Sequence, residues 1–356
     1  MRNIVTAGTV VGKNEKKYVW DAVSKMGDPD HFKDYVYKFE EAFAKRVGSK
    51  YAFAVVNGTA AMHLGLLAMG IGKGDEVIVP DLGYISAANV VTYVGAKPVF
   101  ADIDPINWCL YPGSVKKRIT KKTKAIMPVW MYGSVPNMEG LMELGIPIIE
   151  DSCPALGSYY CEKHAGTFGE VGCFSFQGAK VTSTGEGGML VTDSDKINAK
   201  VRKLADMGIT KQEFFHDEIG YMYEMSPILA AVGLGQLEHA DRMIAQKVKI
   251  FEIYYKALRD SFGMNYFDEW SSPNMWMSSI LADSVKQRNQ IREHLKKNKI
   301  DTRPFFYPQS MFGLYKGNWK NPVSYDIGLR GINLPSRVDL TKKEVDYVIK
   351  KIQEVI

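Results

Sequence analysis

The stretch that decides the fold is residues 172 to 193, GCFSFQGAKVTSTGEGGMLVTD. Two apolar runs, each short enough to be a buried strand, enclose a segment rich in glycine. Lys180 lies among small residues at the point where the chain leaves the first run. Burial there would lower the pKa of the ammonium group and favour the neutral amine, which attacks carbonyl carbons. The alternative is an ordinary lysine on the solvated surface.

Apolar runs of the same length precede this stretch. They occupy residues 51 to 56, 76 to 80, 97 to 102, 124 to 130 and 146 to 151. Helical patterns lie between them; in one, Val36, Phe39, Phe43 and Val47 recur at helical spacing. Apolar runs separated by helices predict an α/β fold, a mostly parallel central sheet with helices on both faces. In such sheets ligands bind at the carboxyl ends of the strands.

The pattern changes after residue 226. A long helical stretch with one break is followed by a strand-like run at residues 275 to 283 and an amphipathic helix at 284 to 298. Thr341 and Glu344 form a capping box ahead of a terminal helix. We therefore expect a large domain of residues 1 to 235 and a smaller C-terminal α/β domain of residues 236 to 356.

Composition narrows the possible partners. The 45 basic and 40 acidic side chains give a net charge of +5, which is too balanced to favour nucleic acid. No stretch is apolar over the length that spans a membrane, and the first residues lack the apolar core of a secretion signal. The four cysteines lack metal-binding spacing. We expect a cytoplasmic protein with no metal, nucleic-acid or membrane partner.

Asn57-Gly58-Thr59 follows the first apolar run and opens a helix. The free amides of a first helical turn bind anions, and glycine lets a phosphate approach the backbone. The same three residues are also an ordinary helix cap. Gly58 and Thr59 are therefore candidates for phosphate binding, with capping as the alternative.

Three more candidates follow apolar runs or lie within them. Asp151 ends the run at 146 to 151, where it is either a helix cap or the partner of a protonated heterocyclic nitrogen, which would make that ring an electron sink. Tyr84 either packs in the core or offers a flat face to a planar ring. By strand alternation, Ser175 points away from its two phenylalanine neighbours and could meet a phosphate.

The order and spacing of these candidates resemble the pyridoxal 5'-phosphate site of fold-type I enzymes. Five segments are similar to the DegT/DnrJ/EryC1/StrS family of sugar aminotransferases: NGTAAMHLGLLAMGIGKGDEVIVP (57 to 80), GAKPVFADID (95 to 104), IIEDSCPALGS (148 to 158), GTFGEVGCFSFQGAK (166 to 180) and TGEGGMLVTD (184 to 193). The likeness extends over almost the whole chain, and the order of the segments carries it.

The resemblance implies a role for each candidate. Lys180 matches the lysine that binds the cofactor covalently and moves a proton between cofactor and sugar carbons. Asp151 matches the partner of the pyridine nitrogen, and Tyr84 the aromatic residue stacked on the ring. Glu186 lies in a loop that faces the substrate in this family. Three residues match contacts to the cofactor phosphate: Gly58, Thr59 and Ser175.

The resemblance also implies a reaction in two halves with ping-pong kinetics. Glutamate would leave its amine on the cofactor as pyridoxamine 5'-phosphate, and a keto sugar would then take it. The family is dimeric with a site near the subunit interface, so we expect a homodimer. The closest alternatives are a sugar 3-dehydratase, in which histidine replaces the lysine, a 3-keto sugar aminotransferase, and a non-catalytic sensor dimer that binds the cofactor or a nucleotide sugar.

The segment from Asp301 to Pro308 is similar to that of perosamine-synthase-like members, where it helps to hold a nucleotide sugar. Arg303 offers a fork for a diphosphate, and Phe305 or Tyr307 a face for sugar or base. The alternative is a structural arginine on a strand. We expect a nucleotide-linked 4-keto-6-deoxyhexose, GDP-linked ahead of UDP- or dTDP-linked.

Three positions depart from the family pattern. Pro154 stands where the family has a glutamine, histidine or glutamate near the phenolic oxygen of the cofactor. Met222 replaces an asparagine that reaches the phosphate of the neighbouring subunit, and Glu224 replaces a basic residue. These departures put the contact across the dimer in doubt and leave the chemistry at Lys180 intact.

Overall fold

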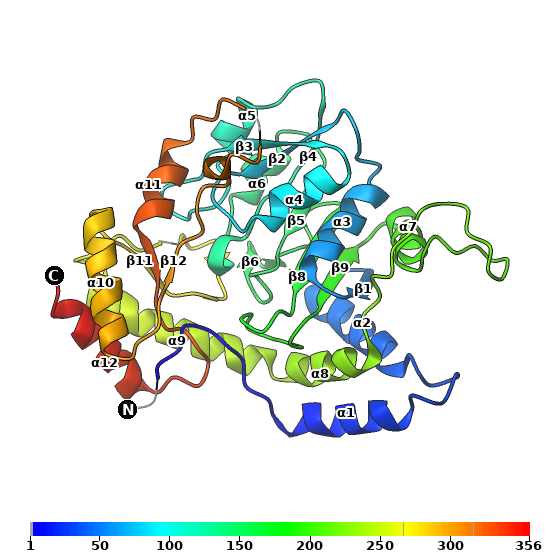
Figure 1. The fold of residues 1–356 in the computed structure, drawn as a ribbon, viewed down its shortest axis with the longest axis horizontal. Helices are drawn as coiled ribbons and strands as arrows, with labels where there is room; N and C mark the ends of the chain where they lie inside the picture. The colour runs from blue at the N-terminus through cyan, green and yellow to red at the C-terminus, as the bar shows by residue number, and fades with distance from the viewer. Residues whose placement is uncertain (1–2, 266, 316) are drawn as a thin grey trace.

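The apolar runs of the sequence form the central strands of the structure (Figure 1). The structure is a computed structural model that describes residues 3–265, 267–315 and 317–356. The central strands are β1 (Tyr51–Val55), β2 (Glu76–Pro80), β3 (Lys97–Ala101), β4 (Thr123–Ile126), β5 (Ile149–Asp151), β8 (Val171–Ser175) and β9 (Gly188–Thr192).

These strands form two sheets that meet edge to edge. One has the order β3-β2-β4 and the other β1-β9-β8-β5. Isolated parallel bridges, Ile126 with Ile148 and Val129 with Asp151, connect the edges at β4 and β5. Strand β9 runs antiparallel to both of its neighbours, because a loop without a helix returns the chain from β8. The predicted α/β fold with a mostly parallel sheet is thus confirmed.

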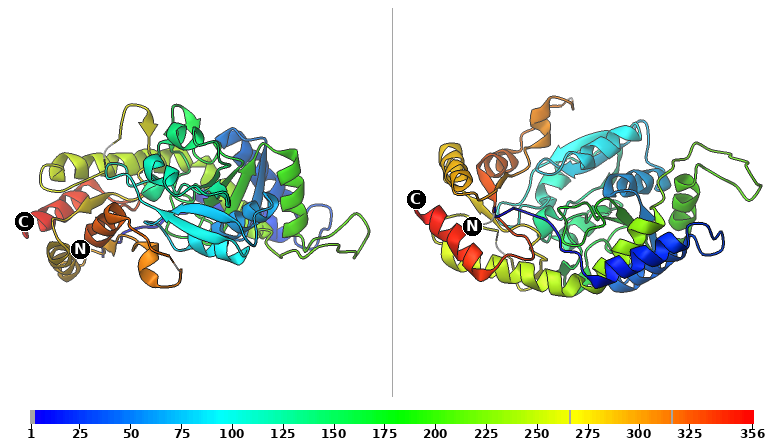
Figure 2. Two further views of the ribbon diagram at one scale, coloured as in Figure 1. Left: turned by 90° about the horizontal axis from the view of Figure 1, so that it is seen from above. Right: turned by 60° about the horizontal axis from the view of Figure 1, so that its bottom comes forward.

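Helices cover both faces of this sheet, as the views from above and below show (Figure 2). The helices before residue 206 are α1 (Lys13–Ser24), α2 (Asp34–Val47), α3 (Gly58–Ala68), α4 (Ser86–Tyr93), α5 (Pro112–Lys116), α6 (Met138–Met142) and α7 (Asp195–Ala205), with a 3-10 turn at Met131–Gly133. Helices α3, α4 and α7 share one core cluster, and α2 packs on the other face. There Phe43 meets Phe174 and Phe176 at ring-centroid distances of 5.0 and 5.6 Å.

A second core lies in the C-terminal part of the chain. Helix α8 (Pro227–Glu238) and helix α9 (Ala240–Leu258) meet at His239, where the sequence predicted one break. The remaining elements are α10 (Val285–Lys297), α11 (Pro322–Arg330), α12 (Lys342–Gln353), strands β10 (Ser271–Ser272), β11 (Ser279–Leu281), β12 (Arg303–Pro304) and β13 (Gly331–Asn333), a 3-10 turn (Gln309–Phe312), and the short strands β6 (Tyr159–Tyr160) and β7 (Lys163–His164). The capping box predicted for α12 is present.

The N-terminal segment belongs in part to this second core. Ile4 forms a parallel bridge with Ile300 and is buried in the cluster of α9, α10 and α12. We had expected residues 1 to 235 to form the large domain. A contact across almost three hundred residues has no local sequence signal, so the first strand-like residues pack with the C-terminal unit instead.

Two buried aspartates bind the C-terminal unit to the sheet. Asp102, just after β3, accepts hydrogen bonds from the backbone N–H groups of Val323 and Ser324 at the start of α11. Asp81, just after β2, accepts bonds from the backbone and hydroxyl of Ser310 and from the Asn321 amide. Both carboxylates lie at the carboxyl ends of parallel strands, so the C-terminal unit is fixed at the edge where ligands bind.

Candidate active site

A cavity of about 400 Å³ opens at the carboxyl ends of the central strands. It lies between the ends of β5 and β8, the start of α3 and residues of the C-terminal unit. The sequence candidates that line it are Gly58, Thr59, Tyr84, Asp151, Ser175, Lys180 and Arg303. The fold therefore brings together residues separated by more than two hundred positions in the chain.

Lys180 is held in a short turn after β8. Its backbone N–H donates to the Gln177 carbonyl at 2.8 Å, and the Gln177 side chain accepts from the backbone of Ala179 at 2.8 Å. The amine lies 3.8 Å from the centre of the Trp276 ring. Burial lowers the pKa of Lys180, while Cys153 and Asp151 partly oppose this shift. The environment thus favours the neutral, nucleophilic amine, as a Schiff-base lysine requires.

Asp151 ends strand β5 and is buried. Its carboxylate accepts hydrogen bonds from the backbone N–H of Cys153, at 3.1 Å, and from the Cys153 thiol. Burial raises the pKa of Asp151, and Cys153 and Lys180 act in the opposite direction. A buried carboxylate that faces a cavity can hold a cation there, such as a protonated ring nitrogen.

The start of α3 both caps the helix and faces the cavity, which are the two roles that the sequence allowed for it. Asn57 caps the helix, because its side-chain oxygen accepts from the backbone N–H of Ala60 at 2.8 Å. Gly58 and Thr59 still face the cavity with the first-turn amides. A side chain at position 58 would not fit, since a Cβ there would lie 2.6 Å from the sulfur of Cys153.

Ser175 and Tyr84 add a hydroxyl and an aromatic face. Ser175 lines the cavity, whereas its neighbours Phe174 and Phe176 pack against α2. The alternation of the strand produces this arrangement. Tyr84 is 58% exposed, so it is not a core residue, and its ring lies 5.5 Å from that of Phe306.

Three sequence candidates, Phe305, Tyr307 and Glu186, lie outside the cavity. Phe305 is 1% exposed and packs against Trp108 and Tyr132, while Tyr307 is 42% exposed and does not line the cavity. The aromatic residue of this segment that does line the cavity is Phe306. In a regular strand, Phe305 would lie on the same face as Arg303, because side chains alternate between the two faces. Strand β12 ends at Pro304, so this alternation does not extend to Phe305.

Glu186 lines a separate hollow of about 300 Å³ beside α2 and the segment around Met222. Met222 is exposed there. Glu224 forms an ion pair with Lys33 on the chain before α2, with an N–O distance of 2.6 Å. The acidic side chain of Glu224, at a position where the family has a basic residue, is thus paired with a lysine of the same chain.

The structure adds cavity residues that sequence reasoning missed. Trp276 reaches the cavity from the C-terminal unit, and its only sequence signal was an apolar run that reads as a buried strand. Pro154, which the resemblance had already placed near the cofactor, lines the cavity as well, and its carbonyl accepts from the Asn274 amide at 2.8 Å. Both positions depend on contacts between distant parts of the chain.

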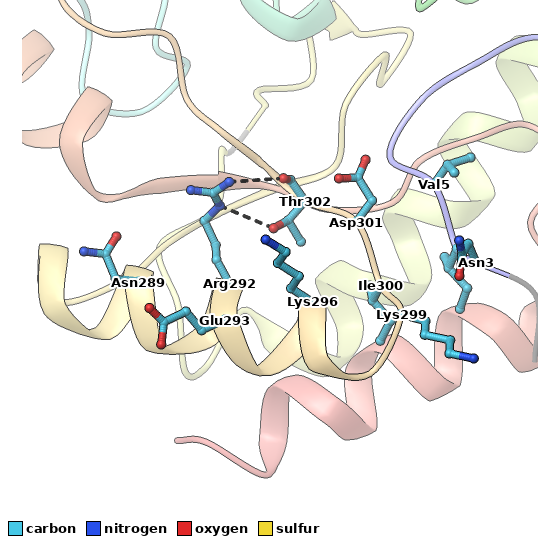
Figure 3. A pocket seen from close by; sticks show the side chains of 11 residues that line it. Asn3, Val5, Asn289, Arg292, Glu293, Lys296, Lys299, Ile300, Asp301 and Thr302 are labelled. Carbon is cyan, nitrogen blue, oxygen red and sulfur yellow. Dashed lines mark hydrogen bonds between the residues drawn. The ribbon is translucent and has the colours of Figure 1, made fainter.

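A larger hollow, about 650 Å³, lies on the outer side of the C-terminal unit (Figure 3). Helix α10 lines it with Arg292, Glu293 and Lys296, and Arg292 is bonded to Thr302. Arg292, Lys296 and Lys299 share this hollow with the carboxylates of Glu293 and Asp301, so its charges are mixed. It contains none of the predicted site residues.

In residues 3–265, 267–315 and 317–356, no helix has both the length and the apolar character needed to cross a bilayer. The same part of the chain holds no group of three or more histidine, cysteine, aspartate or glutamate side chains arranged to bind a metal ion.

Comparison with known proteins agrees with this geometry. The model of the DegT/DnrJ/EryC1/StrS aminotransferase family matches residues 11–353. The chain is 40% identical to the GDP-perosamine synthase of Escherichia coli O157:H7, over 97% of this chain and 96% of that protein. It is 37% identical to the GDP-perosamine synthase of Vibrio cholerae, over 94% of each chain.

Solved structures show the same fold. The pyridoxal phosphate form of a putative sugar aminotransferase, Spr1654 from Streptococcus pneumoniae, matches with a TM-score of 0.91 and 25% identity, over 99% of this chain and 98% of that one. The predicted fold-type I architecture and the predicted enzyme class, an aminotransferase, are confirmed. The chain belongs to the DegT/DnrJ/EryC1/StrS aminotransferase family.

Proposed function

We propose that this enzyme transfers an amino group from glutamate to a nucleotide-linked 4-keto-6-deoxyhexose, giving a 4-amino-4,6-dideoxy sugar nucleotide. The observation that carries the proposal is the Lys180 amine in a cavity shared with Asp151 and the first turn of α3. A lysine at this position argues against the related 3-dehydratases, which carry histidine. The similarity to two GDP-perosamine synthases supports a GDP-linked sugar ahead of UDP- or dTDP-linked ones.

The residues of the cavity fit pyridoxal 5'-phosphate. The free amides of Gly58 and Thr59, with the Ser175 hydroxyl, form an anion site suited to the phosphate. Asp151 supplies the buried negative charge that a protonated ring nitrogen requires. Tyr84 offers a face to the ring, and Lys180 the amine for covalent attachment. When bound, the cofactor supplies an electron sink for negative charge on the neighbouring carbon.

The protein groups supply proton transfer and orientation. Burial lowers the pKa of Lys180 and so favours the neutral amine, whose Nζ can accept a proton from a substrate carbon and later return it. Asp151 keeps a positive charge fixed at the far side of the cavity. Arg303, which is exposed at the cavity edge, and Phe306 are the proposed contacts for the diphosphate and the sugar or base.

We also propose that the active form is a homodimer. The loop between α7 and α8 exposes large apolar side chains, with Phe214 84% and Ile219 86% accessible, and Met222 is exposed beside them. Trp20 on α1 is exposed as well. Apolar side chains of this size that stand free in one chain mark a contact surface, and a second copy of this chain is the proposed partner.

The experiment is a panel of GDP-, UDP- and dTDP-linked keto sugars incubated with glutamate and the purified holoenzyme, with products identified by mass. We expect amination of the GDP-linked 4-keto sugar to be fastest. Amination of a 3-keto sugar alone would overturn the 4-keto assignment. A visible spectrum that no amino donor changes would point instead to a sensor that binds the cofactor without turnover.

A further inference from the structure

The indole of Trp276 is fixed against the reactive amine. Its ring centre lies 3.8 Å from Nζ of Lys180, and its side chain is buried. The indole N–H donates to the carbonyl of Ala179, the residue before the lysine, at 2.7 Å. The ring is thus hydrogen-bonded to the same turn that carries the amine.

Buried polar side chains fix the backbone of Trp276 from two directions. Asn274 accepts from the Trp276 N–H at 2.9 Å, and its amide donates to the carbonyls of Pro154 and Leu156 at 2.8 and 3.0 Å. Lys247 on α9 donates to the Trp276 carbonyl at 2.9 Å. The indole is therefore fixed both to the loop after Asp151 and to the long helix of the C-terminal unit.

An aromatic face at this distance stabilises an ammonium group, and the effect grows where water is excluded. Burial acts in the opposite direction, because it favours the neutral amine. A lysine that takes a proton from one carbon and gives it to another must be a usable base and a usable acid in turn. The two opposing effects meet at one atom, Nζ of Lys180.

We propose that Trp276 is a further catalytic residue, whose indole face holds the Lys180 amine in place and stabilises its protonated form. The proton that Nζ gains from one carbon is the proton that it returns to the other, so the step needs no additional reactant. The role concerns Lys180 as the reacting amine and thus rests on the proposed aminotransferase function. It does not depend on which sugar is the substrate.

The test measures the pKa of Lys180 in the cofactor-free protein. Trace acetylation at a series of pH values, followed by mass spectrometry of the peptide that contains Lys180, gives the fraction of neutral amine. We expect the W276L variant to lower the pKa of Lys180 by about 0.4 to 1.5 pH units, because the π face is lost and burial remains. W276F, which keeps an aromatic ring, should give a smaller shift in the same direction.

A matched control is W108F, which alters a buried tryptophan outside the cavity and should leave the pKa of Lys180 unchanged. If W276L does not fold, the W276F measurement decides alone, with folding checked by circular dichroism. An unchanged or raised pKa in W276F or W276L would overturn the proposal. Because no substrate is used, this result is independent of the sugar panel, so either proposal can fail without the other.

Discussion

At the scale of single residues, the site depends on charges that are buried beside each other. Lys180 and Asp151 influence each other's pKa, and the Cys153 thiol contacts the same carboxylate. Removing one member therefore changes the protonation of the other.

Substitution of Lys180 should abolish the activity. K180A removes both the covalent attachment point and the proton carrier, so kcat should fall by about 10³-fold or more. Borohydride reduction followed by mass spectrometry of the intact protein should show cofactor attached to the wild type and none attached to K180A. Lys196 on α7 offers a control, and K196A should retain both attachment and activity.

Substitution of Asp151 should alter both rate and pH dependence. D151N keeps the shape and removes the negative charge, so kcat should fall by about 10² or more. Asp151 raises the pKa of Lys180, so its loss should move the Lys180 pKa further down. Trace acetylation of the cofactor-free variant would show this shift, and an upward shift would contradict the coupling described here.

Part of the cavity could be predicted from residues at or near strand ends. Asp151 ends an apolar run, and Gly58 and Lys180 come within four residues after one, so their position in the sequence implies their position at the end of a strand. Phe306 was missed because the segment after Arg303 is not regular strand beyond Pro304, so the sequence does not show which of its aromatic side chains faces the cavity. Trp276 was missed because its contact with Lys180 joins two units, and no local pattern encodes such a contact.

At the scale of elements, apolar runs located every central strand to within a few residues, and the break between α8 and α9 lies where helical spacing was interrupted. The direction of β9 could not be read in the same way. Strand direction depends on the connection, and the loop between Ser175 and Gly188 has the length of a short crossover without a helix. Pairing order is likewise set by tertiary packing.

Helix α9 carries a buried amine whose protonation should affect stability. Lys247 donates to the Trp276 and Ser336 carbonyls, and burial lowers its pKa to about 7. An unfolded lysine titrates near pH ~10.4. Between these values the unfolded chain binds a proton that the native chain lacks, so the free energy of unfolding should rise with pH. From pH ~7 to ~9 the gain from this residue is at most about 2.7 kcal/mol.

The measurement is urea unfolding at both pH values for the wild type, K247M and K249M. K247M should lose this part of the pH dependence, because methionine does not titrate. Lys249 is exposed on the same helix, so K249M should retain the wild-type dependence. Equal pH dependence in all three proteins would show that Lys247 stays protonated in the native state.

At the scale of the whole molecule, two units share one site. The large sheet provides Lys180 and Asp151, and the C-terminal unit provides Trp276, Arg303 and Phe306. The division at residue 235 stays a prediction from the sequence. The sequence did not indicate that Ile4 packs in the second core, because that contact joins opposite ends of the chain.

The contact between the central sheet and the C-terminal unit should be weakened by substitution of Asp102. D102N replaces an acceptor that serves two backbone N–H groups and the Ser324 hydroxyl, and one of its oxygens becomes an amide donor. We expect a loss of about 1 to 3 kcal/mol in the free energy of unfolding, measured by urea denaturation. Asp260 is highly exposed, and D260N serves as a control with no expected change. Equal stability of D102N and the wild type would show that this contact does not limit unfolding.

The position of Asn274 has a mechanical consequence. One side chain is bonded at once to the loop after Asp151 and to the backbone of Trp276. If the C-terminal unit swung open like a hinged lid, these bonds would break and the indole would leave the amine. Such a motion would therefore cost these hydrogen bonds, whereas the cavity already reaches the exposed Arg303 with the two units docked.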